Sequence, residues 1–163
     1  MVNILFVCNA NRFRSVIAAE YFRYLLQQNQ TTEDWAVSSA GTWAKDGLPP
    51  IAEAVRFAKT QGLDIDNVRS REVTSTSIEE ADLILVMSEG QKEGLSTEFP
   101  KAKKKIFMLS EICEGQTYDI PDPVERKDEI PEELGSEICV LVYNGFNNIC
   151  KKAIKNLNLY RVI

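Results

Sequence analysis

Histidine is absent from the 163 residues of this chain, and its absence excludes several kinds of chemistry. There is no histidine general base, no Ser-His-Asp triad and no metal site with an imidazole ligand. Long apolar runs are also missing, since no stretch approaches the roughly 18 residues that a membrane-spanning helix needs. Any proton donor in a reaction must therefore come from Asp, Glu, Lys, Tyr or Cys.

An excess of basic residues is missing too. Lys and Arg number 19 against 24 Asp and Glu, which gives a net charge of −5. This balance argues against binding to nucleic acid or to an anionic membrane through bulk charge. The length and the 44% hydrophobic content predict a single globular domain over residues 1–163. We expect a monomer or a weak dimer.

Cysteine is sparse and scattered. The four thiols belong to Cys8, Cys113, Cys139 and Cys150, and no C-x-x-C pair occurs. A zinc site would need all four to converge, so we expect no metal and no cofactor. The N-terminus MVNILFVC lacks the basic region of a signal peptide. We therefore expect a reducing cytoplasm, where a single cysteine is available as a reagent.

Short apolar runs alternate with helical patterns along the chain. This alternation is typical of βαβ units and predicts a three-layer α/β sandwich, in which helices cover both faces of a parallel sheet. A long loop is expected at 111–130, and Gly135 and Gly145 raise the question of a break in the last helix. The predicted strands are 2–7, 35–40, 82–87 and 105–109, and the predicted helices are 15–28, 49–62 and 131–157.

A thiol and an Arg-Ser pair flank the loop after the first strand, in the pattern C-x5-R-S. In open α/β sheets ligands bind at the carboxyl ends of the strands, where Cys8 lies. The N-terminus of the following helix favours the thiolate form of Cys8 and would make it a nucleophile. The Ser15 hydroxyl is placed either to bond the Cys8 sulfur or to cap the helix.

The same loop contains the groups that a phosphate-binding site needs. The Arg14 guanidinium can hold two phosphoryl oxygens, and successive backbone N–H groups can surround the others. The other interpretation is a buried Cys8 with Arg14 as a surface charge. The expected loop amides belong to Asn9, Ala10, Asn11, Arg12 and Phe13.

The segment FVCNANRFRSVIAAEYF resembles the signature C-x-G-N-x-C-R-S of the low-molecular-weight protein tyrosine phosphatases. The blocks WAVSSAGT, RSREVT, DLILVM and YDIPDP resemble family blocks in the same order. This resemblance implies a four-stranded parallel sheet flanked by helices. It also implies hydrolysis of phosphotyrosine, in a phosphorylated protein or another aryl phosphate, through a phosphocysteine on Cys8.

The resemblance assigns a general acid and base as well. Asp122 lies in the Asp-Pro pair of the long loop, with Asp119 as its nearest rival. The alternative is that Asp122 only forms a turn before proline. Trp43 falls where the family places residues that wall the pocket, although core burial is an equal alternative.

Several positions depart from the family pattern. Ala10 replaces a glycine, which costs about 1 kcal/mol if this position needs a positive φ. Phe13 replaces the second cysteine of the loop. Arg12 is either a solvated charge or a selector of acidic substrates, and it should disfavour a guanidinium-bearing substrate such as phosphoarginine. Val68 replaces a histidine, and 124–125 replaces an aromatic pair.

Two other functions fit parts of the sequence. Thioredoxin-coupled arsenate reductases are similar over the first loop, but they need two further cysteines after the third strand. Residues 88–95 contain none, and the next thiol is Cys113. The second alternative is a phosphate-binding module that Ala10 and Arg12 have made inactive.

Overall fold

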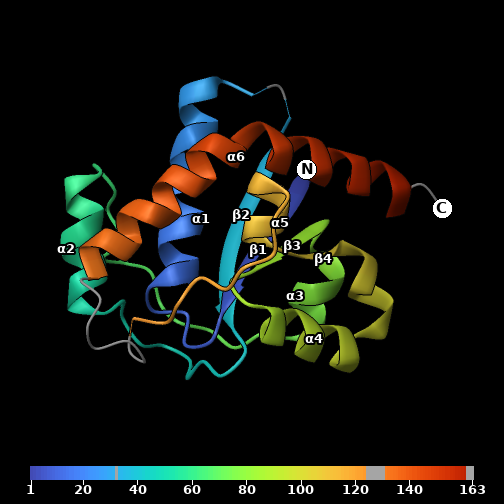
Figure 1. Ribbon diagram of the computed structural model, residues 1–163, viewed down its shortest axis with the longest axis horizontal. Helices are drawn as coiled ribbons and strands as arrows, with labels where there is room; N and C mark the ends of the chain where they lie inside the picture. Colours follow the sequence, from blue (N-terminus) through green and yellow to red (C-terminus); the bar gives the residue numbers. More distant parts are fainter. Residues whose placement is uncertain (32, 124–130, 161–163) are drawn as a thin grey trace.

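The computed structural model describes residues 1–31, 33–123 and 131–160. Its centre is a four-stranded parallel sheet with the strand order β2-β1-β3-β4 (Figure 1). The sequence therefore predicted the right strands in the right places, with small differences at their ends. The strands are β1 (Val2–Cys8), β2 (Trp35–Gly41), β3 (Leu83–Val86) and β4 (Ile106–Met108).

The two central strands are apolar on both faces because helices cover both sides of the sheet. Phe6 and Val7 of β1 are fully buried although they point to opposite faces. Phe6 belongs to the larger core, which helices on one side of the sheet complete. Val7 belongs to a smaller core formed with helices on the other side. These three layers confirm the predicted sandwich.

The helices differ more from the prediction than the strands do. Two short helices, α3 and α4, were missed because they are largely polar, and α5 occupies the start of the predicted loop at 111–130. The family departure at 124–125 lies outside the described residues. The helices are α1 (Arg14–Asn29), α2 (Ala52–Thr60), α3 (Ser75–Glu80), α4 (Glu89–Glu98), α5 (Leu109–Glu114) and α6 (Pro131–Tyr160), with the 3-10 helix η1 (Pro100–Lys105) after α4.

Helix α6 runs without a break through Gly135 and Gly145, so a break at these glycines is excluded. Both glycines instead allow close packing. A Cβ at Gly135 would lie 2.7 Å from the ring of Phe57, and one at Gly145 would collide with Cys113. The two glycines therefore let α2 and α5 approach the long helix. Within the described ranges, no helix combines the length and the apolar character needed to cross a bilayer.

Candidate active site

Cys8 is the last residue of β1 and is 3% exposed. Its Sγ lies 3.0 Å from the Oγ of Ser15, in the first turn of α1. Phe13 occupies the N-cap position of that helix, so Ser15 contacts the sulfur and does not cap. A hydroxyl at this distance can donate a hydrogen bond to the Cys8 sulfur.

Between Cys8 and α1 lies the first loop (residues 9–13), which Asn11 supports from inside. Asn11 is 1% exposed, and its amide nitrogen donates to the hydroxyls of Ser15 and Ser39 at 2.9 Å each. Its carbonyl oxygen accepts from the backbone N–H of Arg71 at 3.0 Å. The backbone of Arg71 thus supplies a contact to Asn11 without the histidine that Val68 replaces.

The strained residue of the first loop is Asn11 rather than Ala10. Among the described non-glycine residues, a positive φ is found at Asn11 (55°) and at Gln30 (45°). The expected cost of replacing glycine at Ala10 therefore does not arise. Asparagine tolerates this left-handed conformation better than most residues, and its buried bonds hold it there.

Arg14 connects the first loop to the Asp-Pro loop (residues 115–123). It is 4% exposed, so the interpretation as a surface charge is wrong. One terminal nitrogen donates to the carbonyl oxygen of Ile120 at 2.8 Å, and the other pairs with Asp122 at 3.3 Å. The Asp122 side chain is 17% exposed, so it remains open to solvent at the site.

Asp119 has a different position. Its carboxylate accepts from the backbone N–H of Glu89 at the start of α4, at 2.9 Å. The backbone N–H of Ile120 donates to the carbonyl oxygen of Met87 at 2.8 Å. Asp119 and Ile120 therefore attach the Asp-Pro loop to the end of β3, whereas Asp122 is the carboxylate directed at Arg14.

Gln91 is a residue that the sequence reasoning missed. Its side-chain oxygen accepts from the N–H groups of Met87 and Ser88, and its nitrogen donates to the Oδ1 of Asn9 at 2.8 Å. It is 6% exposed and joins the end of β3 to the first loop. The available signal was the capping box of Ser88 and Gln91 directly after a buried strand.

Arg12 and Phe13 complete the first loop without facing the sulfur in any recorded contact. Phe13 is 4% exposed and belongs to the larger core. The half-buried Arg12 donates from Nε to the carbonyl oxygen of Pro49 at 2.8 Å, and Ile51 donates back to its carbonyl oxygen at 3.1 Å. The Arg12 guanidinium thus has a fixed backbone partner beside the first loop.

Trp43 lies on the surface, at 88% exposure, so core burial is excluded. Its backbone N–H donates to the carbonyl oxygen of Asn9 at 2.9 Å, which fixes it beside the first loop. Trp43, Asn9, Ser88 and Gln91 are among the residues that line a cavity of about 400 Å³. The geometry thus brings Trp43 to the rim of this cavity, whose lining includes Asn9 of the first loop but not Cys8, Arg14 or Asp122.

The other cysteines have a different environment from Cys8. Burial raises the pKa of Cys113 and of Cys139 to about 12, and that of Cys150 to about 11. These three thiols therefore stay protonated at neutral pH. Among the residues that the structure describes, no recorded hydrogen bond joins these thiols to a hydroxyl as Ser15 is joined to Cys8.

Comparisons with known proteins agree with this geometry. The family model for low molecular weight phosphotyrosine protein phosphatase matches residues 3–157. The chain therefore belongs to this family, whose members are hydrolases.

Two relatives of this chain are named for different substrates. The protein-arginine-phosphatase of Geobacillus stearothermophilus is 32% identical over 139 residues, which cover 85% of this chain and 90% of the relative. The human low molecular weight phosphotyrosine protein phosphatase is 32% identical over 148 residues, covering 88% and 92%. The solved structure of the low molecular weight protein tyrosine phosphatase from T. tengcongensis has a TM-score of 0.81 and 29% identity, covering 93% and 99%.

Proposed function

We propose that this protein hydrolyses phosphotyrosine and related aryl phosphate monoesters through a phosphocysteine on Cys8. The observation that carries the proposal is the position of Arg14. Arg14 directly follows the loop after Cys8 and pairs with Asp122 at 3.3 Å, and this pairing supports a common site for nucleophile, phosphate-binding cation and acid. Membership of the phosphatase family supports the same reaction.

In the first step the Cys8 thiolate attacks phosphorus. The S–P bond forms as the bond from phosphorus to the aryl oxygen breaks, and protonated Asp122 gives its proton to the departing oxygen. The Arg14 guanidinium exchanges its hydrogen bonds to Asp122 and Ile120 for hydrogen bonds to two phosphoryl oxygens. The backbone N–H groups of the first loop bind the remaining charge.

In the second step water hydrolyses the phosphocysteine. The Asp122 carboxylate takes a proton from the water, whose oxygen bonds to phosphorus as the S–P bond breaks. The electron pair returns to the sulfur, where the Ser15 hydroxyl donates a hydrogen bond to it. The products are inorganic phosphate, the free thiolate and a protonated Asp122 ready for the next cycle.

Arg12 favours phosphotyrosine over phosphoarginine. Related proteins are named for each substrate, so family membership does not decide between them. The Arg12 guanidinium is held at the first loop by Pro49, and a second guanidinium in the substrate would be repelled there. Trp43 at the rim offers a ring face on which a phosphotyrosine ring can pack.

The partner follows from the family and the setting from the thiols. Membership of the phosphatase family supports a phosphorylated protein as partner, and the four free cysteines support a reducing cytoplasm. The arsenate reductase alternative gains no support, because burial under α6 holds the pKa of the Cys113 thiol at about 12. The inactive-module alternative loses its main argument, since Ala10 has no positive φ.

The test is hydrolysis of an aryl phosphate by the purified protein. We expect Cys8→Ser to reduce turnover by about 10⁴-fold or more, because a neutral hydroxyl replaces the nucleophile. Cys150→Ser is the matched control, since this half-buried thiol lies on α6 and should leave turnover unchanged. Equal turnover in the wild type and Cys8→Ser would overturn the proposal.

A further inference from the structure

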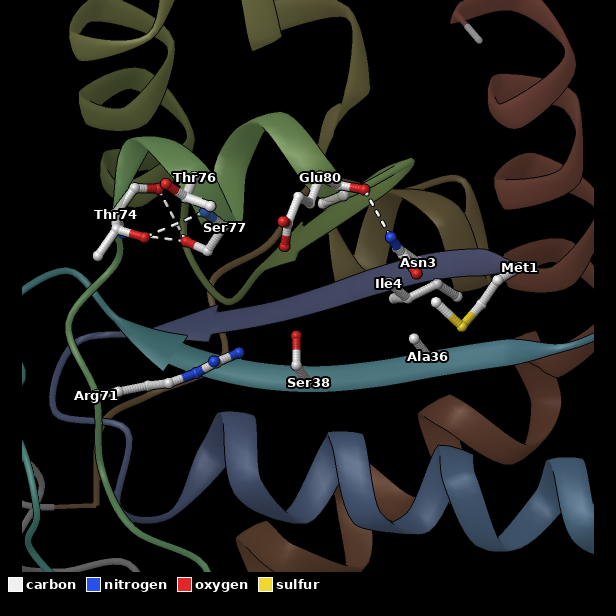
Figure 2. Close-up of a pocket in the computed structure, with 11 residues that line it drawn as sticks. Met1, Asn3, Ile4, Ala36, Ser38, Arg71, Thr74, Thr76, Ser77 and Glu80 are labelled. Carbon is white, nitrogen blue, oxygen red and sulfur yellow. Dashed lines mark hydrogen bonds between the residues drawn. The ribbon is translucent and has the colours of Figure 1, made fainter.

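Two cavities of similar size differ in their relation to the first loop. One, of about 350 Å³, lies beneath α3 at the edge of the sheet (Figure 2). Polar groups there are bonded within the protein, since Asn3 donates to the backbone oxygen of Glu80, and Thr74 and Ser77 bond to each other. The other, of about 400 Å³, is lined by Asn9 of the first loop and by one face of α4. We call this second cavity the α4 groove.

Two glycines of α4 keep the groove open. A Cβ at Gly90 or at Gly94 would meet no atom within 4 Å, whereas a Cβ at Gly135 or Gly145 would collide with a packed side chain. Gly94 therefore weakens the middle of α4 without allowing a closer contact inside the described part of the protein. Glycines let another backbone approach a helix closely, so the groove has the shape that an extended peptide segment needs.

Trp43 lines the groove together with the glycines. Its side chain is 88% exposed, and its backbone is held by the hydrogen bond to the carbonyl oxygen of Asn9. Tryptophan is among the residue types that most often anchor a binding partner. Since Asn9 directly follows Cys8 in the chain, the groove is continuous with the loop of the nucleophile. It is therefore suited to a part of the substrate other than the phosphate.

A single carboxylate gives the groove its charge. Of the described residues that line it, Glu98 alone is charged, and it is exposed and forms no ion pair with another described residue. Glu98 lies about two turns, or about 10 Å, along α4 from Gln91, whose side chain donates to Asn9 at 2.8 Å. An extended peptide covers this distance in about three residues.

We propose that the α4 groove binds the segment of the substrate protein next to the phosphotyrosine, and that Glu98 selects a lysine or arginine about three residues from it. This inference rests on the proposed function and adds the sequence that surrounds the phosphorylated residue. The segment passes Trp43 and lies over Gly90 and Gly94, and its cationic side chain reaches Glu98. Because Glu98 is exposed, the selection is modest and decreases with ionic strength.

Calorimetry on the Cys8→Ser variant tests the groove without the reaction. The probes are two phosphotyrosine peptides that carry either lysine or glutamate at the third position on both sides of the phosphotyrosine. We expect the lysine peptide to bind about threefold more tightly at low ionic strength. Adding Glu98→Lys should reverse this order. Glu93→Lys, which makes the same change of net charge on α4 outside the groove, should preserve it.

Two further variants test the shape of the groove. Gly94→Leu fills it and should weaken the binding of both peptides by about fivefold, whereas Thr97→Leu adds the same side chain to α4 outside the groove and should not. Equal binding of the two peptides, or equal effects of Glu98→Lys and Glu93→Lys, would overturn the inference even if the wild type hydrolyses both peptides. A lysine preference in binding without hydrolysis by the wild type would instead overturn the proposed function alone.

Discussion

The two loops that meet at Arg14 are built in different ways. The first loop is held from inside, because Asn11 and Arg14 are almost completely buried and bond to β2, Arg71 and Ile120. The Asp-Pro loop is exposed over residues 116–119 and is attached through Tyr118, Asp119 and Ile120. The backbone of the first loop is thus held by buried bonds, whereas the position of the proposed acid depends on a few surface bonds.

Within the two loops, the largest effect is expected at the proposed acid. Asp122→Asn removes the proton donor, and turnover of an aryl phosphate with a poor leaving group should fall by about 10²-fold. The loss should shrink for a good leaving group, which needs less protonation. Steady-state rates on the two kinds of substrate measure this difference.

Asp119→Asn is the matched variant, because it keeps the shape and removes the charge three residues earlier. We expect a change within about threefold, since an amide oxygen can still accept from the N–H of Glu89. Equal losses in the two variants would show that the structure assigns the wrong carboxylate.

The next largest effect is expected on the free energy of unfolding, at Asn11, which supports the first loop. Asn11→Ala leaves Ser15, Ser39 and the N–H of Arg71 without their shared partner, and should lower the free energy of unfolding by about 2 kcal/mol. Thr117→Ala, on the exposed part of the Asp-Pro loop, should change it by less than about 0.5 kcal/mol. Urea unfolding of both variants checks the contrast, and similar values would contradict the difference between the loops.

A smaller effect concerns substrate choice at the rim. Arg12→Thr removes the guanidinium held by Pro49 and should raise phosphoarginine turnover relative to phosphotyrosine turnover by about tenfold, since one repulsive charge is lost. The ratio of kcat/KM for the two substrates is the measurement. An unchanged ratio would show that Arg12 plays no part in selection.

The smallest effect is expected on the free energy of unfolding at alkaline pH, from two residues in and next to the Asp-Pro loop. Burial raises the pKa of Cys113 from 9.0 to about 12. Burial and the hydrogen bond to Glu114 raise that of Tyr118 from 10.0 to about 12. The folded state thus favours the protonated forms, so their contribution to stability is complete below pH 9 and is lost as the pH rises toward about 12.

Unfolding measured between pH 9 and pH 12 tests this expectation. The free energy of unfolding should decrease with pH in the wild type and decrease less steeply in Cys113→Ala. Tyr118 is 41% exposed, so solvent screening reduces its share. A free energy that is constant over this range would contradict the assignment.

The sequence predicted those features of the fold and of the site that depend on local sequence patterns. Apolar runs identified the four strands, and the spacing C-x5-R-S placed Cys8 at the end of the first strand and Arg14 at the start of the helix that follows. It missed α4 and the role of Gln91, because a polar helix of ten residues has little apolar periodicity. The resemblance assigned Asp122 rather than Asp119, and the structure adds that Asp122 pairs with Arg14, a contact across 108 residues that no local pattern predicts.

The formation of a phosphocysteine tests the central claim most directly. The protein is mixed with an aryl phosphate and quenched in acid within a single turnover. It is then digested, and the mass of the peptide that contains Cys8 is measured by mass spectrometry. We predict a mass increase of one phosphoryl group on Cys8 that decays as inorganic phosphate appears. Release of phosphate with no phosphorylated Cys8 at any time, in a protein whose Asp122→Asn variant also accumulates none, would contradict the account.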